Sequence, residues 1–378
     1  MIILGIDTSC DDTSVALIEI RNSKTEPRNY GAKVKMRTKF SSPFEVRSNI
    51  ISSQVKIHAK YGGVYPFLAK REHQRNLPLV FRKALKEAGF EIPNPKSQIP
   101  KIDLIAVTVG PGLEPCLWVG VNFIKDLAKN LKLSIIPVNH IEAHIAANFI
   151  GENSTPHQNF GGGPAICLVV SGGHTQLILM KNFGNYKILG ETRDDAAGEC
   201  FDKVARILGL GYPGGPIVAK MATKIKNQKS KIKIVLPRPM IYQKNYDFSF
   251  SGLKTAVLYD FKNRPSKVRE SKIYIQEMAK EVQQAIIDVL IYKTLKATKN
   301  FKAKSIILGG GVASNKELRK QFKEKIQKEL PNIQYLTPDI QFCTDNAAMV
   351  AVAGYFHWLK GEKYNLEKIK ANANLRLG

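Results

Sequence analysis

A hydrophobic strand, a polar turn and a second hydrophobic strand follow one another twice, about half a chain apart. Residues 2–6 and 15–20 are apolar and flank a turn rich in Asp, Thr and Ser. Residues 166–170 and 176–180 flank the small, polar turn 171–175 in the same way. Two such units predict two lobes built on one plan. Turns of this composition suit the binding of a phosphate group or its metal ion.

The rest of the chain alternates between strand-like and helix-like hydrophobic patterns. This alternation predicts an α/β protein, and a length of 378 residues favours two domains. Strands are expected at 103–110, 134–138 and 305–311, and helices at 116–131, 140–149, 198–208, 270–299 and 345–359, with one more starting near Ser314 and Asn315.

The predicted division places residues 1–138 in a first lobe and residues 139–344 in a second. The C-terminal helix, about 345–378, is expected to pack back on the first lobe. Residues 91–101 and 151–164 are rich in Pro, Asn and Gly and are predicted to be surface loops.

Basic residues outnumber acidic ones by 57 to 32, which gives a formal net charge of +25. Such an excess favours binding to polyanions and hence to nucleic acid. The alternative is a composition set by genomic base bias, with a solvated basic surface. Residues 21–50 carry eight Lys or Arg against two acids and are predicted to form a long exposed loop or an extended hairpin. Shorter basic runs lie at 224–233 and 293–304.

Features of secreted and membrane proteins are not apparent in the sequence. No run approaches the roughly 18 apolar residues of a membrane-spanning helix, so no membrane association is expected. The apolar N-terminus predicts a first strand and not a signal peptide. The five cysteines are odd in number, widely spaced and never in a C-x-x-C pair. This favours a reducing, cytoplasmic compartment over a disulfide framework or a structural zinc site.

The segment 140–144, His-Ile-Glu-Ala-His, places two imidazoles at positions i and i+4 of a predicted helix. His140 and His144 would share one face and could hold a metal ion. Glu142 lies two residues after the first histidine, so it points away from the pair, unlike the glutamate of an H-E-x-x-H protease. Asp345 is the candidate third ligand. The alternatives are interior or capping histidines and an aspartate that only caps a helix.

Three glycine loops, 171–173, 211–216 and 309–311, border regular elements. Glycine lets backbone N–H groups approach a phosphate or adenine closely, so a nucleotide cleft is plausible. None of the loops matches a P-loop or a dinucleotide-binding fingerprint. Asp194, Asp195 and Asp202 flank the predicted helix 198–208, where one could bind a ribose or ligand hydroxyl. Asp194 and Asp195 could equally be surface carboxylates.

These motifs coincide with those of a known family. From Ile3 to about Phe356 the chain resembles the tRNA N6-adenosine threonylcarbamoyltransferases, members of the actin-like, sugar-kinase-like ATPase superfold. The resemblance is to the bacterial branch. It rests on GIDTSCDDTS, KYGGVYPFLAKREH, GPGL, NHIEAH, VVSGGHTQL, DDAAGECFDKVARILGLGYPGGP, DFSFSGLKTA, GGGVASN and FCTDNAAM.

The resemblance implies a cleft between two duplicated ribonuclease-H-like lobes. It assigns a divalent metal, Fe²⁺ in first place and Zn²⁺ as the alternative, to His140, His144 and Asp345. Asp11 matches an acidic position at the family's reaction centre and is the implied catalytic residue. The implied substrate contacts are Val169, Val170, Ser171, Gly172, Gly173, Asp202, Gly215 and Asn315.

The implied reaction transfers threonylcarbamoyl from threonylcarbamoyl-adenylate to N6 of adenosine 37 in the anticodon loop of tRNA, with release of AMP. The tRNAs concerned read codons that start with A. The implied partners are tRNA, an inactive paralogue and a small ATPase. The alternatives are a metalloprotease and an actin-like nucleotide-binding scaffold without transferase activity.

Overall fold

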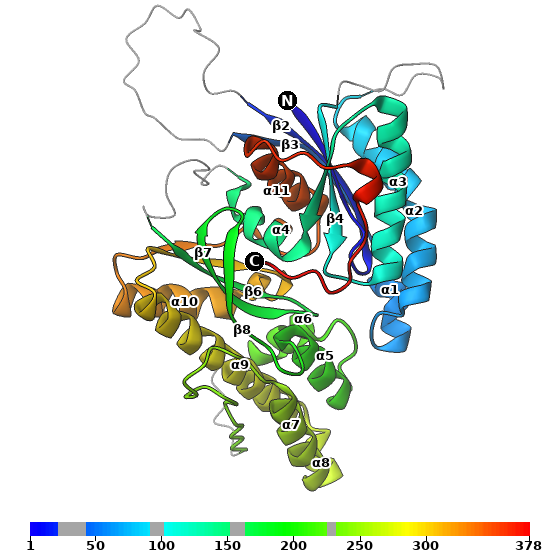
Figure 1. Ribbon diagram of the computed structural model, residues 1–378. Coiled ribbons are helices and arrows are strands. Elements are labelled where there is room, and N and C mark those ends of the chain that lie inside the picture. Colours follow the sequence, from blue (N-terminus) through cyan, green and yellow to red (C-terminus); the bar gives the residue numbers. More distant parts are fainter. Residues whose placement is uncertain (22–42, 91–101, 152–162, 225–231) are drawn as a thin grey trace, which may run out of the picture. The chain divides into compact units, whose positions relative to one another are not determined.

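The computed structural model describes residues 1–21, 43–90, 102–151, 163–224 and 232–378. The chain forms two compact units, each with its own mixed β-sheet and helices (Figure 1). The first unit comprises Met1–Ser53, Pro66–Gln158 and Asp345–Arg376. The second comprises Gln54–Tyr65, Asn159–Thr344 and the last two residues.

The two sheets have the same topology. The first sheet has the order β3-β2-β1-β4-β5 and the second β8-β7-β6-β9-β10. In each, the first two pairings are antiparallel and the last two are parallel. The predicted two-lobed α/β fold on one repeated plan is therefore confirmed. The strands are β1 Ile2–Asp7, β2 Asp12–Ile20, β3 Phe44–Ser53, β4 Leu104–Gly110, β5 Ile135–Asn139, β6 Ala165–Val170, β7 Thr175–Asn182, β8 Asn185–Glu191, β9 Ser305–Gly309 and β10 Gln334–Leu336.

Helices cover both faces of the sheet in the first unit. Leu4 and Ile6 of β1 belong to the apolar core shared with α2 and α3. Gly5, between them, faces the opposite side because successive strand residues alternate in direction. There α11 packs on β1, β2 and β4, and also on α4 (Figure 1). These helices are α2 Pro66–Glu87, α3 Glu114–Leu131, α4 His140–Ala146 and α11 Ala347–Leu359.

The second unit is built around the long helix α9, whose side chains are buried on most sides. It packs with α6 and with β6, within a core that also holds Phe201, Phe248 and Phe250. A helix that is buried on most of its sides is typical of a domain interior. The helices of this unit are α1 Val55–His58, α5 Ala197–Ile207, α6 Gly214–Ala222, α7 Ser251–Asn263, α8 Ser266–Arg269, α9 Lys272–Asn300 and α10 Lys316–Glu329.

Several predicted boundaries differ from the structure. Residues 139–151 belong to the first unit and not to the second, because α4 packs against α11. The loop expected at 211–216 ends early, since α6 begins at Gly214. A proline such as Pro216 is compatible with a first helical turn, where N–H groups lack partners within the helix.

The basic segment 21–50 is only partly described. Residues 44–50 belong to β3, which pairs antiparallel with β2, so for these residues the hairpin alternative is correct. Residues 22–42 lie outside the described residues, as do 91–101, most of 151–164, and 225–231 of the second basic run.

The third basic run is partly engaged in contacts within the protein. Lys293 is fully buried, and its ammonium donates a hydrogen bond to the Asn245 carbonyl. Lys296 donates to the carbonyls of Gln243 and Lys244, and Lys299 forms an ion pair with a glutamate of α10. Each of these three lysines therefore has a partner within the second unit, and Lys293 contributes no charge to the surface.

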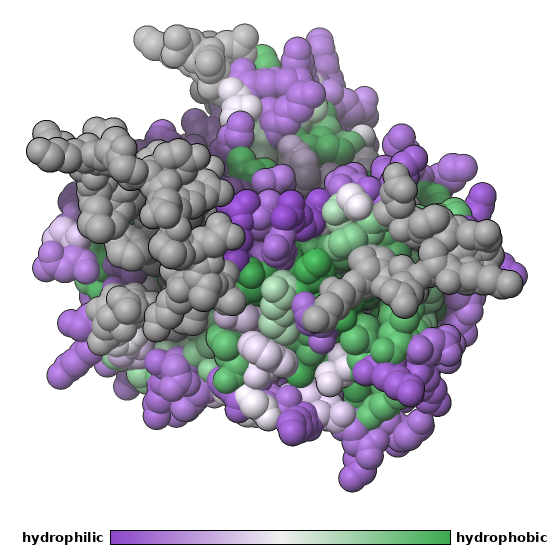
Figure 2. Space-filling model, turned by 90° about the horizontal axis from the view of Figure 1, so that it is seen from above, coloured by the Kyte–Doolittle hydropathy of each residue, from purple (hydrophilic) through white to green (hydrophobic). Residues whose placement is uncertain are grey.

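Hydrophilic residues make up much of the face seen in Figure 2. Among the described residues, no helix combines the length and the apolar character needed to cross a membrane.

Candidate metal centre and ligand loops

Helix α4 starts at His140, directly after the buried strand β5. The Asn139 side chain caps it by accepting hydrogen bonds from the backbone N–H groups of Ile141 and Glu142. This cap fixes the start of the helix, so His140 and His144 lie one turn apart. Their ring centroids are 4.6 Å apart, and the two side chains are almost entirely buried.

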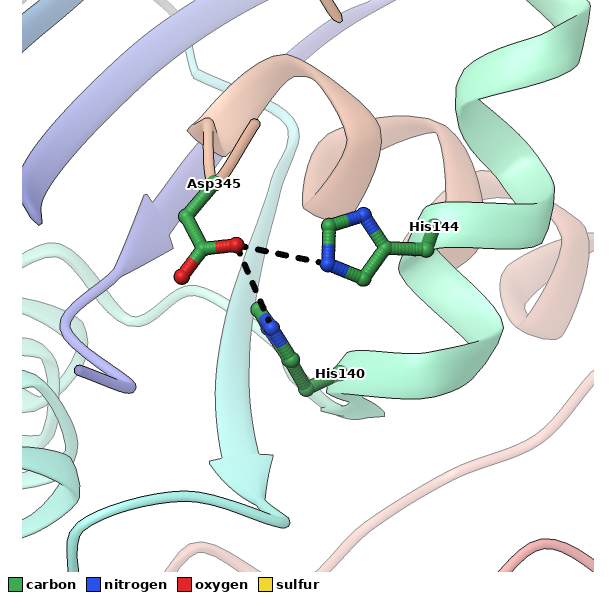
Figure 3. A group of neighbouring side chains, drawn as sticks. All are labelled: His140, His144 and Asp345. Carbon is green, nitrogen blue, oxygen red and sulfur yellow. Dashed lines mark ion pairs between the residues drawn. The ribbon is translucent and has the colours of Figure 1, made fainter. Parts of the chain in front are cut away.

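Asp345 lies just ahead of α11 and does not cap it. The capping residue is Asn346, whose side chain accepts the N–H of Met349 at 3.1 Å. The Asp345 carboxylate is therefore left to face the histidines. Its Oδ1 lies 3.5 Å from Nε2 of His140 and 3.3 Å from Nε2 of His144 (Figure 3). The structure thus brings all three predicted metal ligands together.

Asp7 is a further member of the group that sequence reasoning missed. It ends β1 and is fully buried, and its Oδ2 lies 3.5 Å from Nδ1 of His140. A carboxylate on the second nitrogen of a ligating imidazole sets its tautomer and orientation. The signal in the sequence that could have identified Asp7 is an acidic residue directly after the apolar run 2–6.

The three ligand residues fit a divalent metal ion. One ligand atom from each of His140, His144 and Asp345 lies within 4.8 Å of the others. Both ring nitrogens of His144 are buried and make no hydrogen bond to the described part of the chain. Such unsatisfied buried groups are costly unless a ligand satisfies them. Two imidazoles and one carboxylate are donors that both Fe²⁺ and Zn²⁺ accept, and they leave coordination positions for a substrate.

The electrostatics of the group also favour a cation. Burial opposes the charged form of His140, but the carboxylates of Asp345 and Asp7 outweigh it and raise the pKa of His140 above its ordinary value. Burial lowers the pKa of His144. Burial acts against ionisation of Asp345, yet the charge of His140 and the proximity of both imidazoles hold the pKa of Asp345 well below its ordinary value. The carboxylates that stabilise a proton here would equally stabilise a metal ion.

More carboxylates surround the turn between β1 and β2. Burial, and then the charges of Asp345, Asp11 and Asp7, raise the pKa of Asp12 to about 7, against a lowering effect from Ser53. Burial and the charges of Asp11 and Asp345 raise the pKa of the Cys10 thiol well above its ordinary value. Asp11, the predicted catalytic residue, is half-buried. Its charge and that of Asp345 both act on Cys10 and Asp12, so the two carboxylates share one acidic environment.

Glu142 is turned to a different partner. Its Oε2 lies 2.6 Å from Nε2 of His357, near the end of α11. A carboxylate held there is not placed to activate a water on the metal, which disfavours the metalloprotease alternative.

In the second unit, two of the glycine loops lie at the same sheet edge. The loop 171–173 follows β6 and the loop 309–311 includes the end of β9, and these parallel strands pair with Val169 opposite Gly309. Carboxyl ends of parallel strands are where α/β proteins bind ligands. Gly310 has φ +88° and would place a Cβ 2.4 Å from the Val170 carbonyl oxygen, so only glycine suits this position.

The predicted contacts in the 169–173 segment differ in what they can offer a ligand. Val169 and Val170 are fully buried, so only their backbone could contact one. Ser171 accepts the N–H of His174 on its hydroxyl, which shapes the turn. Gly172 and Gly173 are exposed and have open space where a side chain would lie.

The other predicted contacts also have structural roles. Asp202 on α5 accepts the N–H of Gly214 at 2.6 Å and so holds the start of α6, where Gly215 is half-buried. Asn315 caps α10 and donates to Gln283 at 2.9 Å.

Asp194 and Asp195 both bind groups of the protein itself. Asp194 accepts hydrogen bonds from the hydroxyls of Ser249 and Ser251 and from two backbone N–H groups at the start of α7. Asp195 pairs with Lys203. These internal partners explain the position of each aspartate without a ligand.

Together, the fold and site define a two-lobed α/β protein with a His–His–Asp group that could hold a metal ion. The family model described as TsaD, tRNA N6-adenosine threonylcarbamoyltransferase, matches residues 45–352. Proteins named tRNA N6-adenosine threonylcarbamoyltransferase are similar over nearly their whole length. The one from Thermosipho africanus (strain TCF52B) is 45% identical and covers 96% of each chain. The one from Geobacillus kaustophilus (strain HTA426) is 41% identical and covers 99% of this chain and 96% of its own. This chain belongs to the tRNA N6-adenosine threonylcarbamoyltransferase family.

A solved structure, HypF of T. kodakarensis, matches with a TM-score of 0.52 at 13% identity. The match covers 95% of this chain and 48% of that one. It shows a shared fold.

Proposed function

We propose that this chain transfers a threonylcarbamoyl group to N6 of adenosine 37 in the anticodon loop of tRNAs that read codons starting with A. Family membership over nearly the full length supports the reaction. The observation that carries the proposal is the buried group of His140, His144 and Asp345. It lies in the segments whose sequence suggested this family.

The proposed donor is threonylcarbamoyl-adenylate. The adenosine N6 attacks the carbamoyl carbon, a C–N bond forms, the bond from that carbon to the phosphate oxygen breaks, and AMP leaves as the N6 proton is lost. The glycine loops of the second unit are the proposed site for the adenylate. They would use the backbone of Val169 and Val170 together with Ser171, Gly172 and Gly173. Asp202, Gly215 and Asn315 are proposed contacts that would keep their capping roles.

The proposed metal is Fe²⁺, with Zn²⁺ as the alternative, held by His140, His144 and Asp345. When bound, it would supply a Lewis acid that neutralises charge on a phosphate or carbamoyl oxygen. Asp7 would hold the His140 ring through its Nδ1. Positioning by these buried side chains matters because the N6 amine is a weak nucleophile.

Asp11 is the proposed catalytic residue, supported by its place in the acidic turn beside the metal group. We expect Asp11→Asn to lower kcat by about 100-fold or more, as removal of a positioned acid–base group does. Metal content should stay unchanged, because Asp11 is not one of the ligands. Single-turnover transfer and metal analysis of the same preparation would test this. Transfer at the wild-type rate would remove Asp11 from the mechanism.

The net charge of +25 supports tRNA binding. An anticodon loop base lies outside regular duplex, so its presentation to an enzyme costs less than flipping a paired base. We also propose an inactive paralogue and a small ATPase as partners, from the family resemblance, and a cytoplasmic location, from the pattern of cysteines. Omitting each partner in turn from a reconstituted reaction would test the partner proposal.

The deciding experiment is mass analysis of nucleosides from unmodified tRNA incubated with the protein, its partners and threonylcarbamoyl-adenylate. The wild-type protein should form threonylcarbamoyladenosine. The double variant His140→Ala, His144→Ala should retain its circular dichroism spectrum, lose metal, and form no product. Full activity of that variant in metal-free buffer would overturn the metal-dependent mechanism. Binding of tRNA and adenylate without product from the wild type would favour the scaffold alternative.

A further inference from the structure

The helices α4 and α11, which position the three proposed metal ligands, make a second polar contact away from those ligands. His140 and His144 lie on α4, and Asp345 lies two residues before α11. The two helices pack together. Glu142 of α4 meets His357 of α11, with Oε2 and Nε2 2.6 Å apart.

The two contacts lie far apart along α11. His357 lies ten residues beyond Ala347, the first residue of α11, which is about 15 Å of helix at the usual rise per residue. On α4, Glu142 is two residues from each histidine and so points to the opposite side of the helix. The Glu142–His357 contact therefore lies on the side of α4 away from the metal ligands. It adds a polar contact to the packing that orients α4, whose residues are all buried.

The Glu142–His357 pair is built as a buried, supported interaction. The side chain of Glu142 is only 3% exposed and that of His357 only 14%. Nδ1 of His357 lies 2.9 Å from Oε2 of Glu362, which also accepts the Tyr364 hydroxyl. Burial opposes the charged imidazole, but hydrogen bonds and charge from Glu142 and Glu362 raise the pKa of His357.

We propose that Glu142 and His357 are positioning residues that hold α4 against α11, so that His140, His144 and Asp345 stay arranged for the metal ion before it binds. This inference rests on the proposed metal site. Neither residue contacts the ion. Their effect is on metal affinity, because a site that must be rearranged binds its ion less tightly.

The test measures metal affinity directly and not transferase activity. Metal-free wild type, Glu142→Gln, His357→Leu and His357→Gln are titrated with Zn²⁺ against a chromophoric chelator, and their thermal unfolding is followed without metal. We expect His357→Leu and Glu142→Gln to raise the Zn²⁺ Kd by about tenfold, the low end for residues that support metal ligands. His357→Gln keeps a hydrogen-bond donor for Glu142 and should raise the Zn²⁺ Kd by less.

Two comparisons separate positioning from general stability. Leu359→Ala, at an exposed residue in the same last turn of α11, should leave the Kd unchanged. The double variant Glu142→Gln, His357→Leu should be no worse than the worse single variant, because both remove one interaction. Folded variants with lower Tm and wild-type Kd would overturn the proposal. A wild type that binds no Zn²⁺ or Fe²⁺ would overturn the metal site and the positioning role together. Metal binding without transfer would count against the proposed function alone.

Discussion

At the scale of single residues, Lys293 shows how far composition can mislead. It belongs to a basic run, yet its side chain is fully buried in α9, with the ammonium 5.9 Å from the Phe248 ring centroid. Burial, and then the charge of Lys296, lower the pKa of Lys293 to about 8 from the ordinary 10.5. A charged ammonium in such surroundings reduces the stability of the folded protein at every pH at which it stays protonated.

This predicts a stability that depends on pH. Below pH 8 Lys293 is protonated in both states, and the folded protein bears the full cost of burying the charge. Between pH 8 and 10.5 the folded state loses the proton while the unfolded chain keeps it, so stability rises. Relative to Lys293→Met, the free energy of unfolding of the wild type should increase by roughly 1–3 kcal/mol over this range. Urea unfolding at several pH values measures it.

The matched control is the same substitution at Lys320, an exposed lysine of α10. Any change with pH that Lys320→Met shares with Lys293→Met would come from the loss of a lysine and not from the burial of its ammonium, since the Lys320 side chain is exposed. A pH dependence for Lys293→Met no larger than that for Lys320→Met would show that the buried ammonium costs nothing.

At the scale of elements, the position of α11 depends on small residues beneath it. A Cβ on Gly5 would lie 2.2 Å from the Ala347 carbonyl oxygen, and one on Gly354 would lie 2.5 Å from Cβ of Ala106. The Ser14 hydroxyl also binds the N–H of Ala347 at 2.8 Å. Close approach of α11 to the sheet therefore places Asp345 beside the histidines.

Replacing Gly5 by Ala should force α11 away from β1. The backbone carbonyl cannot rotate aside, so we expect the free energy of unfolding to fall by about 2–3 kcal/mol, as for an overpacked core. Zn²⁺ affinity should fall with it, because Asp345 moves with the helix. Chemical unfolding and metal titration of the variant test both effects. Gly252→Ala in α7 has no atom within 4 Å of the added methyl group and should not destabilise the protein. Equal stability of the two variants would contradict this account.

Helix α2 was not predicted from the sequence, although its buried residues recur every three or four positions. It contains Pro78, and its charged and apolar residues are mixed, so its pattern is weak. Packing against α3 and against β2 and β3 stabilises it instead. Tertiary contacts of this kind outweigh local propensity.

At the scale of the whole molecule, net charge is the property that bears on the proposed binding of tRNA. We expect Ala or Gln in place of the Lys and Arg residues of 21–50 to weaken tRNA binding and to flatten its dependence on salt. For each phosphate that the variant no longer neutralises, the slope of log K against log salt decreases by nearly one unit. Filter binding across a salt series measures this slope. As a control, Lys316 and Lys320, exposed or half-exposed on α10, are replaced in the same way. An unchanged slope for the 21–50 variant would exclude that segment from the tRNA interface.

The class of fold, the family, the two histidines of the metal group and the candidate third ligand Asp345 could all be inferred from the amino-acid sequence. Strand alternation and the i, i+4 spacing are local properties, and the motifs are stretches of contiguous sequence. The contacts that orient these histidines and Asp345 became apparent only from the folded chain. There Asn346 and not Asp345 caps α11, Asp7 faces His140, and Glu142 meets His357. These contacts join residues up to 215 positions apart, as between Glu142 and His357. No local pattern encodes them, because they follow from how α11 packs on the sheet and on α4.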